Sequence, residues 1–333
     1  MGIAFALGAA ACGGDSGTVT SPSVPSPAPA PPPTPTPAPA VGNMIAGSTF
    51  WVDPLSNARR TAGAWRASRP ADASQLDKIA EQGMARWIGN WNTSVRTDVD
   101  AAVTAMSANG ALPVLVAFNI PQRDCGGLSG GNSTTIDAYR SWITAFAAGL
   151  AGRRAAVILE PDALAGMDCL SAADRQVRLD LLNFAVRTLT ESGNVAVYLD
   201  AGHPRWQSAA TMAQRLVAAG VAMAQGFSLN VSNFVGTSEN ESYGSQLSGL
   251  LGGKHFVIDT GRNGLGPTSD NQWCNPAGRA LGARATPFTG NSLVDAYLWI
   301  KTPGESDGAC NGAPASGVWM PDYALGLAQR AAY

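Results

Sequence analysis

The sequence predicts an α/β protein whose core is a parallel barrel of seven to eight strands. Short runs of β-branched and aromatic residues alternate with segments of helical period throughout residues 43–333. These runs are apolar at nearly every position, which is typical of parallel strands buried on both faces. No glycine-rich phosphate loop follows the first run, which argues against an open dinucleotide-binding sheet.

The expected strands follow one another along the chain, separated by polar turns and helical segments. In order, they occupy residues 48–52 (STFWV), 84–89 (MARWIG), 113–118 (PVLVAF), 155–160 (AAVILE), 195–200 (VAVYLD), 226–231 (GFSLNV), 255–259 (HFVID) and 296–301 (AYLWIK).

Two segments between these runs have the period of surface helices that cover a sheet. Residues 171–193 begin with Ser171 and Asp174, spaced as a capping box, and stop at Gly193. Residues 134–152 form the other helix. The expected buried face of helix 134–152 consists of Ile136, Tyr139, Ile143, Phe146 and Leu150. The expected buried face of helix 171–193 consists of Val177, Leu181, Ala185 and Leu189.

The first 42 residues are not expected to join this fold. Residues 1–19 resemble the end of a bacterial secretion signal, with a short apolar run that ends in small residues at Cys12. Both lipidation at Cys12 and ordinary secretion fit this pattern. Residues 20–42 are rich in Pro, Ala, Thr and Ser, so we expect an extended linker ahead of a catalytic domain at 43–333.

Charge and cysteine content narrow the class of protein. A net charge of −2 offers no basic surface for phosphates, so we expect no nucleic-acid partner. Of the five cysteines, Cys12 has a different role if it is lipidated or removed. The other four can then form two disulfides in an oxidising compartment.

Polar residues follow most of the expected strands. A single carboxylate there can simply cap the next helix. Several that converge on one rim of a barrel indicate a site, because barrel enzymes keep their active sites at the carboxyl ends of the strands. The residues are Asn119, Asp124, Asp162, Asp200, Asn230, Asp259, Lys301, Glu305 and Asp307.

Carboxylates in such a cluster predict acid and base catalysis without a cofactor or metal. The two histidines, His203 and His255, lack the spacing of a zinc site, although a carboxylate site for Mg²⁺ remains an alternative. No serine stands in a G-x-S-x-G turn. Paired carboxylates beside some of the nine tryptophans fit glycosidic bond cleavage.

Six motifs, in order, give the sequence a specific resemblance. They are VLVAFNIPQRDCGGLSGG, VILEPDALAGMDC, VYLDAGHPRW, VIDTGRNGLGP, WCNPAGRALG and LWIKTPGESDG. Together they closely resemble glycoside hydrolase family 6, the cellulases and cellobiohydrolases with a distorted parallel barrel. The resemblance covers nearly all of residues 43–333, and it implies hydrolysis of β-1,4-glucosidic bonds with inversion at the anomeric carbon.

The resemblance also implies a role for each catalytic position. Asp162 matches the general acid, and Asp124 matches the aspartate that raises the pKa of the acid and organises water. Asp307 matches the proposed base, and Ser129 matches the serine of a loop that positions the water. Phe118 departs from the pattern, because the family normally has Tyr there.

Further positions match substrate contacts and disulfides of the family. The resemblance pairs Cys125 with Cys169 and Cys274 with Cys310. We expect four of the other tryptophans, Trp87, Trp91, Trp142 and Trp299, to lie in the core or behind the site. The implied substrate-binding residues are Trp51, Trp206, Trp273, Lys301, Glu305, Asp200, His203, Asn230 and Phe118.

Exo-acting members of the family have long insertions in two loops, whereas here the stretch from Cys125 to Cys169 and the segment after Asp307 are compact. The resemblance therefore implies an open cleft and an endo-acting enzyme, with an exo-acting cellobiohydrolase as the alternative. A non-catalytic glucan-binding protein is the alternative of another class, supported by Phe118. We expect a monomer whose partner is a β-1,4-glucan. We expect it to be secreted, or held on the outer surface of a bacterium by a lipid anchor at Cys12.

Overall fold

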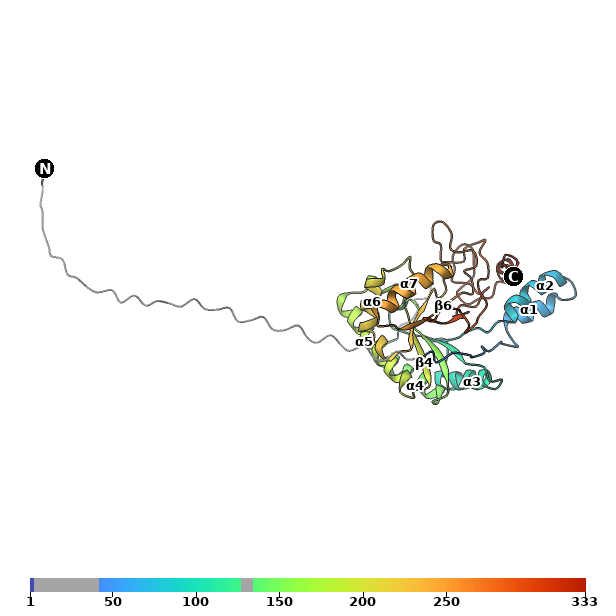
Figure 1. The fold of residues 1–333 in the computed structure, drawn as a ribbon, viewed down its shortest axis with the longest axis horizontal. Coiled ribbons are helices and arrows are strands. Elements are labelled where there is room, and N and C mark those ends of the chain that lie inside the picture. The colour runs from blue at the N-terminus through green and yellow to red at the C-terminus, as the bar shows by residue number, and fades with distance from the viewer. Residues whose placement is uncertain (3–41, 127–133) are drawn as a thin grey trace. The chain divides into compact units, whose positions relative to one another are not determined.

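The computed structural model describes residues 1–2, 42–126 and 134–333 (Figure 1). Within residues 42–333, seven strands form one parallel sheet whose spatial order follows the chain order, from β1 to β7. The strands are β1 (Arg86–Gly89), β2 (Val114–Phe118), β3 (Ala155–Leu159), β4 (Val195–Asp200), β5 (Gly226–Leu229), β6 (His255–Asp259) and β7 (Val294–Leu298).

The sheet curls into a half-barrel, a distorted form of the predicted parallel barrel. Among the described residues, no ladder joins β7 to β1. The two edges still meet, because Ala85 N–H donates to the Trp299 carbonyl (3.0 Å) and the Trp87 indole donates to the Ile300 carbonyl (2.8 Å). These two bonds close the rim without a complete ladder.

The first expected strand, 48–52, is wrong. Only one parallel bridge forms there, between Phe50 and Leu112. The reason is that β2 already pairs with β1 on one edge and with β3 on the other. Leu112, which precedes β2, is therefore the position left to bridge.

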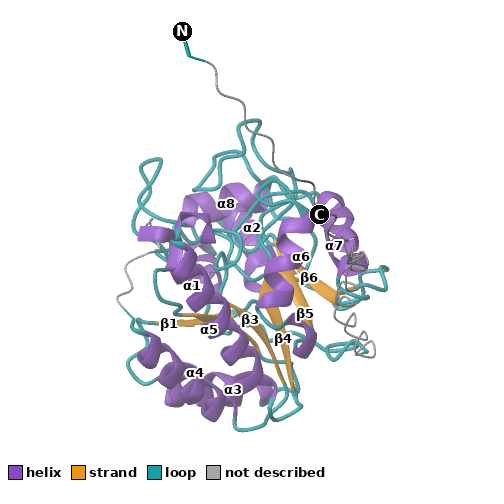
Figure 2. Cartoon of the chain, turned by 90° about the vertical axis from the view of Figure 1, so that its left-hand side faces the viewer, coloured by secondary structure: helices purple, strands orange, loops and turns teal. Residues whose placement is uncertain are grey.

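Eight α-helices surround the strands in the described part of the chain (Figures 1 and 2). Both predicted helices are confirmed as α4 and α5, and the Ser171 hydroxyl caps α5 by accepting the N–H of Asp174 (3.2 Å). Ile136 is exposed rather than buried, because it is the first residue of α4. The helices are α1 (Asn57–Trp65), α2 (Pro70–Ala80), α3 (Val95–Ser107), α4 (Ile136–Leu150), α5 (Ala172–Thr190), α6 (Ala209–Ala218), α7 (Thr237–Leu250) and α8 (Pro321–Gln329).

Successive strand residues alternate between two apolar layers, which explains why the runs are apolar throughout. Val116, Ile158 and Tyr198 belong to the layer inside the half-barrel, together with Ile45 from the N-terminal segment. Val157 and Leu199 belong to the outer layer, which α3 to α7 cover. A third apolar cluster joins α1, α2 and α8.

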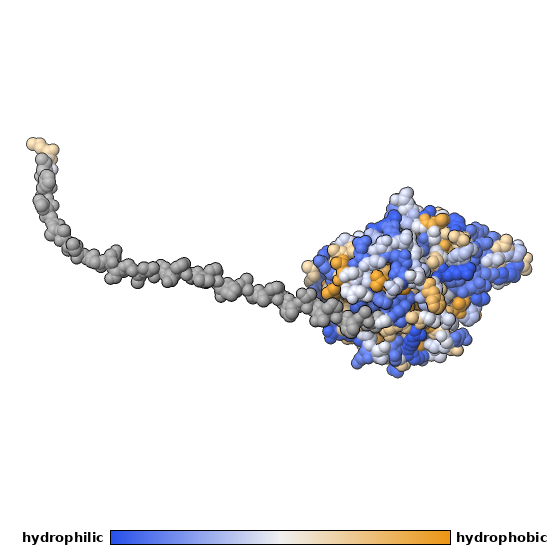
Figure 3. Space-filling model, in the orientation of Figure 1, coloured by the Kyte–Doolittle hydropathy of each residue, from blue (hydrophilic) through white to orange (hydrophobic). Residues whose placement is uncertain are grey.

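The surface is mostly hydrophilic, and Figure 3 shows apolar residues in small separate patches on the visible face. Within the described ranges, every helix is too short or too polar to cross a membrane.

Candidate active site

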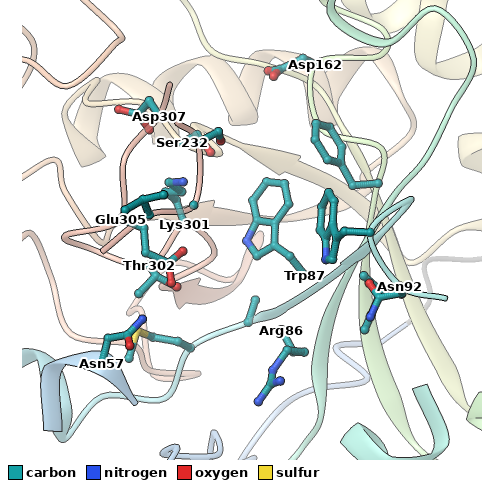
Figure 4. Close-up of a pocket in the computed structure, with 18 of the residues that line it drawn as sticks. Asn57, Arg86, Trp87, Asn92, Asp162, Ser232, Lys301, Thr302, Glu305 and Asp307 are labelled. Carbon is teal, nitrogen blue, oxygen red and sulfur yellow. The ribbon is translucent and has the colours of Figure 1, made fainter. Parts of the chain in front are cut away.

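A cavity of about 1590 Å³ lies at the carboxyl ends of the strands (Figure 4). It brings together residues from both edges and the middle of the sheet, as the sequence predicted. The predicted residues that line it are Trp51, Phe118, Asp124, Asp162, His203, Trp206, Trp273, Lys301, Glu305 and Asp307.

A tight turn after β3 separates two neighbouring carboxylates. Glu160 and Asp162 both have positive φ angles, of 49° and 70°, on either side of Pro161. Glu160 points inward, where its carboxylate accepts the N–H groups of Asn119 (2.9 Å) and Ile120 (3.0 Å). It therefore ties the end of β3 to the end of β2, while Asp162 faces the cavity.

The environment of Asp162 favours the protonated form of its carboxyl. Burial raises the pKa of Asp162 well above its usual range, and the negative charges of Asp200 and Asp124 raise it further. The charge of Arg123 opposes them. A raised pKa favours the protonated carboxyl, and a general acid needs such a proton to donate to a leaving oxygen.

Asp200 lies behind this acid, outside the residues that line the cavity. Its carboxylate accepts the backbone N–H of Asp162 (3.0 Å), the N–H of Gly202 (3.1 Å) and the hydroxyl of Ser228 (3.2 Å). Burial raises the pKa of Asp200 to about 6, although these hydrogen bonds oppose the shift. Asp200 thus holds the acid turn in place and adds to the field that keeps Asp162 protonated.

Asp124 sits in a short 3₁₀ turn, η1 (Arg123–Gly126), after β2. The preceding Arg123 is buried, donates to the Phe118 carbonyl (2.7 Å) and lies 4.0 Å above the Phe118 ring. Arg123 is therefore no surface residue. The disulfide Cys125–Cys169 joins this turn to the loop that follows Asp162.

Asp307 is held by a buried ion pair. One of its oxygens, Oδ2, accepts from Arg262 Nη1 (2.9 Å) and from the N–H of Asn275 (3.0 Å). Its own N–H donates to the Asn275 side chain (2.8 Å). The other oxygen, Oδ1, is buried and has no hydrogen-bond partner among the described residues.

The second disulfide, Cys274–Cys310, lies beside this carboxylate, next to Asn275 in the chain. Both cysteine pairings that the resemblance implied are therefore confirmed. Figure 4 shows Asp162 and Asp307 on different walls of the cavity.

The predicted sugar contacts divide into exposed platforms and buried polar groups. Trp206 and Trp273 are 40% and 49% exposed, and Trp51 is half-buried. His203 lies 5.7 Å from the Trp206 ring, and burial lowers the pKa of His203 to about 4, so the imidazole is neutral near pH 7. Lys301 is buried and donates to the Ser306 carbonyl (3.0 Å).

Asn230, like Asp200, is placed differently from the other predicted contacts. It is fully buried and does not line the cavity. Its amide donates to the Asp259 carbonyl (2.8 Å) and accepts the N–H of Val235 (3.0 Å). Substrate binding by Asn230 stays a prediction. Ser129 and Cys12 lie outside the described residues.

The expectation for the other tryptophans is confirmed in part. Trp299 is 1% exposed, and Trp142 packs against the outer apolar layer. Trp87 and Trp91 line the cavity instead, and Trp91 is 54% exposed, so a core position for Trp91 is wrong. The turn signal Gly-Asn-Trp-Asn after β1 indicated a strand end, where side chains reach the rim.

Sequence reasoning also missed the arginine that holds Asp307. Arg262 follows Asp259 in the quoted motif VIDTGRNG, so its place at a strand end was visible, but its pairing with Asp307 was not.

The fold and the cleft together define a class of protein, the parallel α/β barrels with carboxylates and aromatic platforms at the carboxyl ends of their strands. Within that class, the chain belongs to family 6 of the glycosyl hydrolases, whose family model matches residues 45–331.

Three known proteins show how close this relationship is. The chain is 45% identical over 287 residues to endoglucanase A of Cellulomonas fimi, covering 85% of this chain but 62% of that protein. It is 44% identical over 287 residues to endoglucanase 1 of Streptomyces halstedii, covering 83% and 87%. The structure of the endoglucanase Cel6 from Mycobacterium tuberculosis, in complex with a methyl-cellobiosyl-thio-cellobioside, matches with a TM-score of 0.82 and 47% identity, covering 86% of this chain and 99% of that one.

Proposed function

We propose that the chain is an endo-β-1,4-glucanase that hydrolyses internal bonds of cellulose or related β-glucans and inverts the anomeric centre. The observation that carries this proposal is the placement of Asp162, whose pKa is raised by burial, in a cleft walled by exposed tryptophans. The names of the bacterial relatives, both endoglucanases, support it.

In the proposed reaction, Asp162 gives its proton to the glycosidic oxygen as the bond to the anomeric carbon breaks. A water attacks that carbon from the opposite face and loses a proton toward Asp307 Oδ1, either directly or through further water near Asp124. Inversion requires room for this water, so the acid and base carboxyls should lie roughly 6.5–9.5 Å apart.

The segment after Asp307 favours endo-action over an exo-acting cellobiohydrolase. It runs only from Gly308 to Met320 before α8 begins. The end of this segment also folds back onto Ser306, just before its start. Ser306 N–H donates to the Val318 carbonyl, and Gly317 N–H donates to the Ser306 carbonyl (both 2.9 Å). A short segment held in this way leaves the cleft open to the middle of a long glucan.

Viscosity and reducing ends measured together on carboxymethyl cellulose test the proposal. An endo-acting enzyme lowers viscosity early, with few new ends, and Asp162→Ala abolishes both signals. Release of ends with little loss of viscosity would support the exo alternative. Retained glucan binding with neither signal would support the non-catalytic alternative.

The proposed setting is outside the cell, because two disulfides need an oxidising compartment. We further propose that the chain acts as a monomer and that Cys12 either carries a lipid or is removed with a signal. Mass spectrometry of the mature N-terminus distinguishes these two outcomes.

A further inference from the structure

Trp91 occupies a prepared position at one end of the cleft. It lies in a turn just after β1, in which Asn92 N–H donates to the Gly89 carbonyl (3.0 Å). The Asn92 side chain closes the same turn from the other side, because its carbonyl oxygen accepts the Gly89 N–H (2.9 Å). Its amide group then donates to Asp98 at the start of α3 (3.0 Å). The turn is therefore fixed to both β1 and α3.

Glycine at position 89 makes room for the indole. A Cβ atom there would lie 2.5 Å from two ring carbons of Trp91 and 2.9 Å from the Phe118 carbonyl oxygen. The ring therefore lies across the strand end, with 54% of the residue still exposed. A large apolar side chain held this rigidly and left uncovered indicates a binding surface.

The aromatic surface continues from Trp91 toward the reaction centre. The Trp91 ring is 6.5 Å from the Phe118 ring, which in turn meets Trp87 edge-on at 5.1 Å. Arg123 covers Phe118 and precedes Asp124 in the chain. Figure 4 shows Asn92 and Asp162 far apart on this wall, with Asn92 at the end remote from the acid.

Beyond Trp91, the cavity is bounded by short side chains of α3. Ala101, Ala102 and Ala105 line it there, together with Asp98 and Asn92. Small residues beside an exposed indole leave space for a sugar ring, and the carboxylate and amide can pair with its hydroxyls.

We propose that Trp91 is the floor of an additional subsite for one glucosyl unit of a β-1,4-glucan. The proposal rests on the proposed function and extends it, because it predicts that this arm of the cleft distinguishes long chains from short ones. Asn92 and Asp98 act as positioning residues for the platform.

Two measurements test it, with Trp91→Ala as the main variant. In the first, kcat and KM are measured for cello-oligosaccharides of three to six glucosyl units, with the unchanged protein and with Trp91→Ala. We expect KM for the longest substrate to rise about tenfold, which corresponds to about 1.4 kcal/mol. We expect kcat and the constants for the shortest substrate to stay unchanged. Trp91→Phe should restore most of the affinity, and Asn92→Ala should give a smaller rise in KM.

The matched control is Phe288→Ala, which removes an aromatic ring that is 78% exposed and does not line the cavity. This substitution should leave KM and kcat unchanged for every substrate length. Equal losses for all substrate lengths in Trp91→Ala, or no loss for any, would overturn the proposed subsite.

The second measurement is calorimetric binding of the same oligosaccharides to Asp162→Asn and to Asp162→Asn with Trp91→Ala. It separates the two proposals, because it does not need hydrolysis. If the protein cleaves no β-1,4-glucan, the proposed function fails. The proposed subsite is still supported if Trp91→Ala weakens binding of the longest chain alone. It is contradicted if binding is unchanged.

Discussion

At the level of single residues, the turn after β3 gives two adjacent carboxyls opposite surroundings. Glu160 is buried against the N–H groups of β2, and Asp162 faces the cleft with the charges of Asp200 and Asp124 nearby. Burial raises the pKa of both, but only Asp162 can reach a substrate. Position therefore makes Asp162, and not Glu160, the candidate for the general acid.

The first prediction compares two substitutions in this turn. Asp162→Asn should lower kcat on a soluble β-glucan by roughly 10²–10⁴-fold, because the amide cannot donate a proton to the leaving oxygen. Glu160→Gln should keep most of the turnover, since an amide oxygen can still accept from Asn119 and Ile120. Similar losses of kcat in both variants, with both folded, would contradict the assignment of the acid.

Phe118 carries the second prediction. Its ring lines the cavity, is 7% exposed and is held by Trp87 and Arg123. Phe118→Tyr adds the hydroxyl that the family normally has at this position. If this hydroxyl contacts the reacting sugar, we expect kcat to rise by about tenfold or more, since single preorganised donors contribute effects of this size or larger. An unchanged rate would show that the hydroxyl is dispensable here.

At the level of elements, helix α5 holds together the loops that follow β2 and β3. Arg178 projects from α5 and is only 3% exposed. Its guanidinium donates to the carbonyls of Pro121 (2.9 Å) and Gln122 (2.8 Å), just before Asp124, and to that of Ala163 (3.1 Å), just after Asp162. One side chain thus bridges the loops that carry the acid and its neighbour.

The third prediction concerns this bridge. Arg178→Met would remove a donor from three carbonyls, of which that of Gln122 keeps the Cys125 N–H (3.2 Å). The cost is roughly 1–3 kcal/mol for each carbonyl that stays buried without a partner. We expect a lower free energy of unfolding and a lower kcat with a smaller change in KM, because the substrate platforms lie elsewhere. Arg187→Met, an exposed position on the same helix, is the matched control. Equal effects of the two substitutions would show that Arg178 does not position the loops.

The elements themselves were largely predictable from sequence. Seven of the eight expected strands form, because burial on both faces leaves an apolar run that periodicity detects. The last begins two residues before the expected 296 and ends at Leu298, since the next residue, Trp299, bonds across the rim to Ala85 instead of to β6. The bridge at Phe50 shows the limit, because both edges of β2 are already paired, and the periodicity of a run does not show whether an edge is occupied.

The site residues that belong to a sequence motif were predictable. The contacts between segments that are distant in the sequence were not. Asp162, Asp124 and Asp307 came from strand-end motifs that resemble a family. The contact of Arg262 with Asp307 joins residues 45 apart, and that of Arg178 with Pro121 joins residues 57 apart. No local pattern encodes such pairs, because only the closed sheet brings them together.

At the level of the whole molecule, the strand ends gather carboxyls that bind protons more tightly in the folded chain. Burial raises the pKa of Glu160 to about 7 and that of Asp200 to about 6. It also raises the pKa of Asp162, Asp259 and Glu305. The arrangement that prepares the acid for catalysis therefore works against folding once these groups ionise.

The fourth prediction follows from the sign of these shifts. A carboxyl whose pKa is raised on folding contributes stability that is fully present below its unfolded pKa, near 4, and is lost as pH rises through its folded pKa. His203 acts in the opposite direction, because its pKa is lowered to about 4, so its contribution grows between about pH 4 and 6.5. With five carboxyls against one imidazole, we expect the free energy of unfolding to be lower at pH 8 than at pH 5.

Urea unfolding at several pH values measures this dependence. Glu160→Gln and Asp162→Asn should each make the decline shallower, since each removes one group that must give up its proton. Phe288→Ala should leave the slope unchanged, because it removes no titrating group. A flat profile for the unchanged protein, or identical slopes in all variants, would mean that these carboxyls are already ionised at pH 5. Asp162 would then hold no proton to donate, so the same experiment tests the protonation state on which the proposed reaction depends.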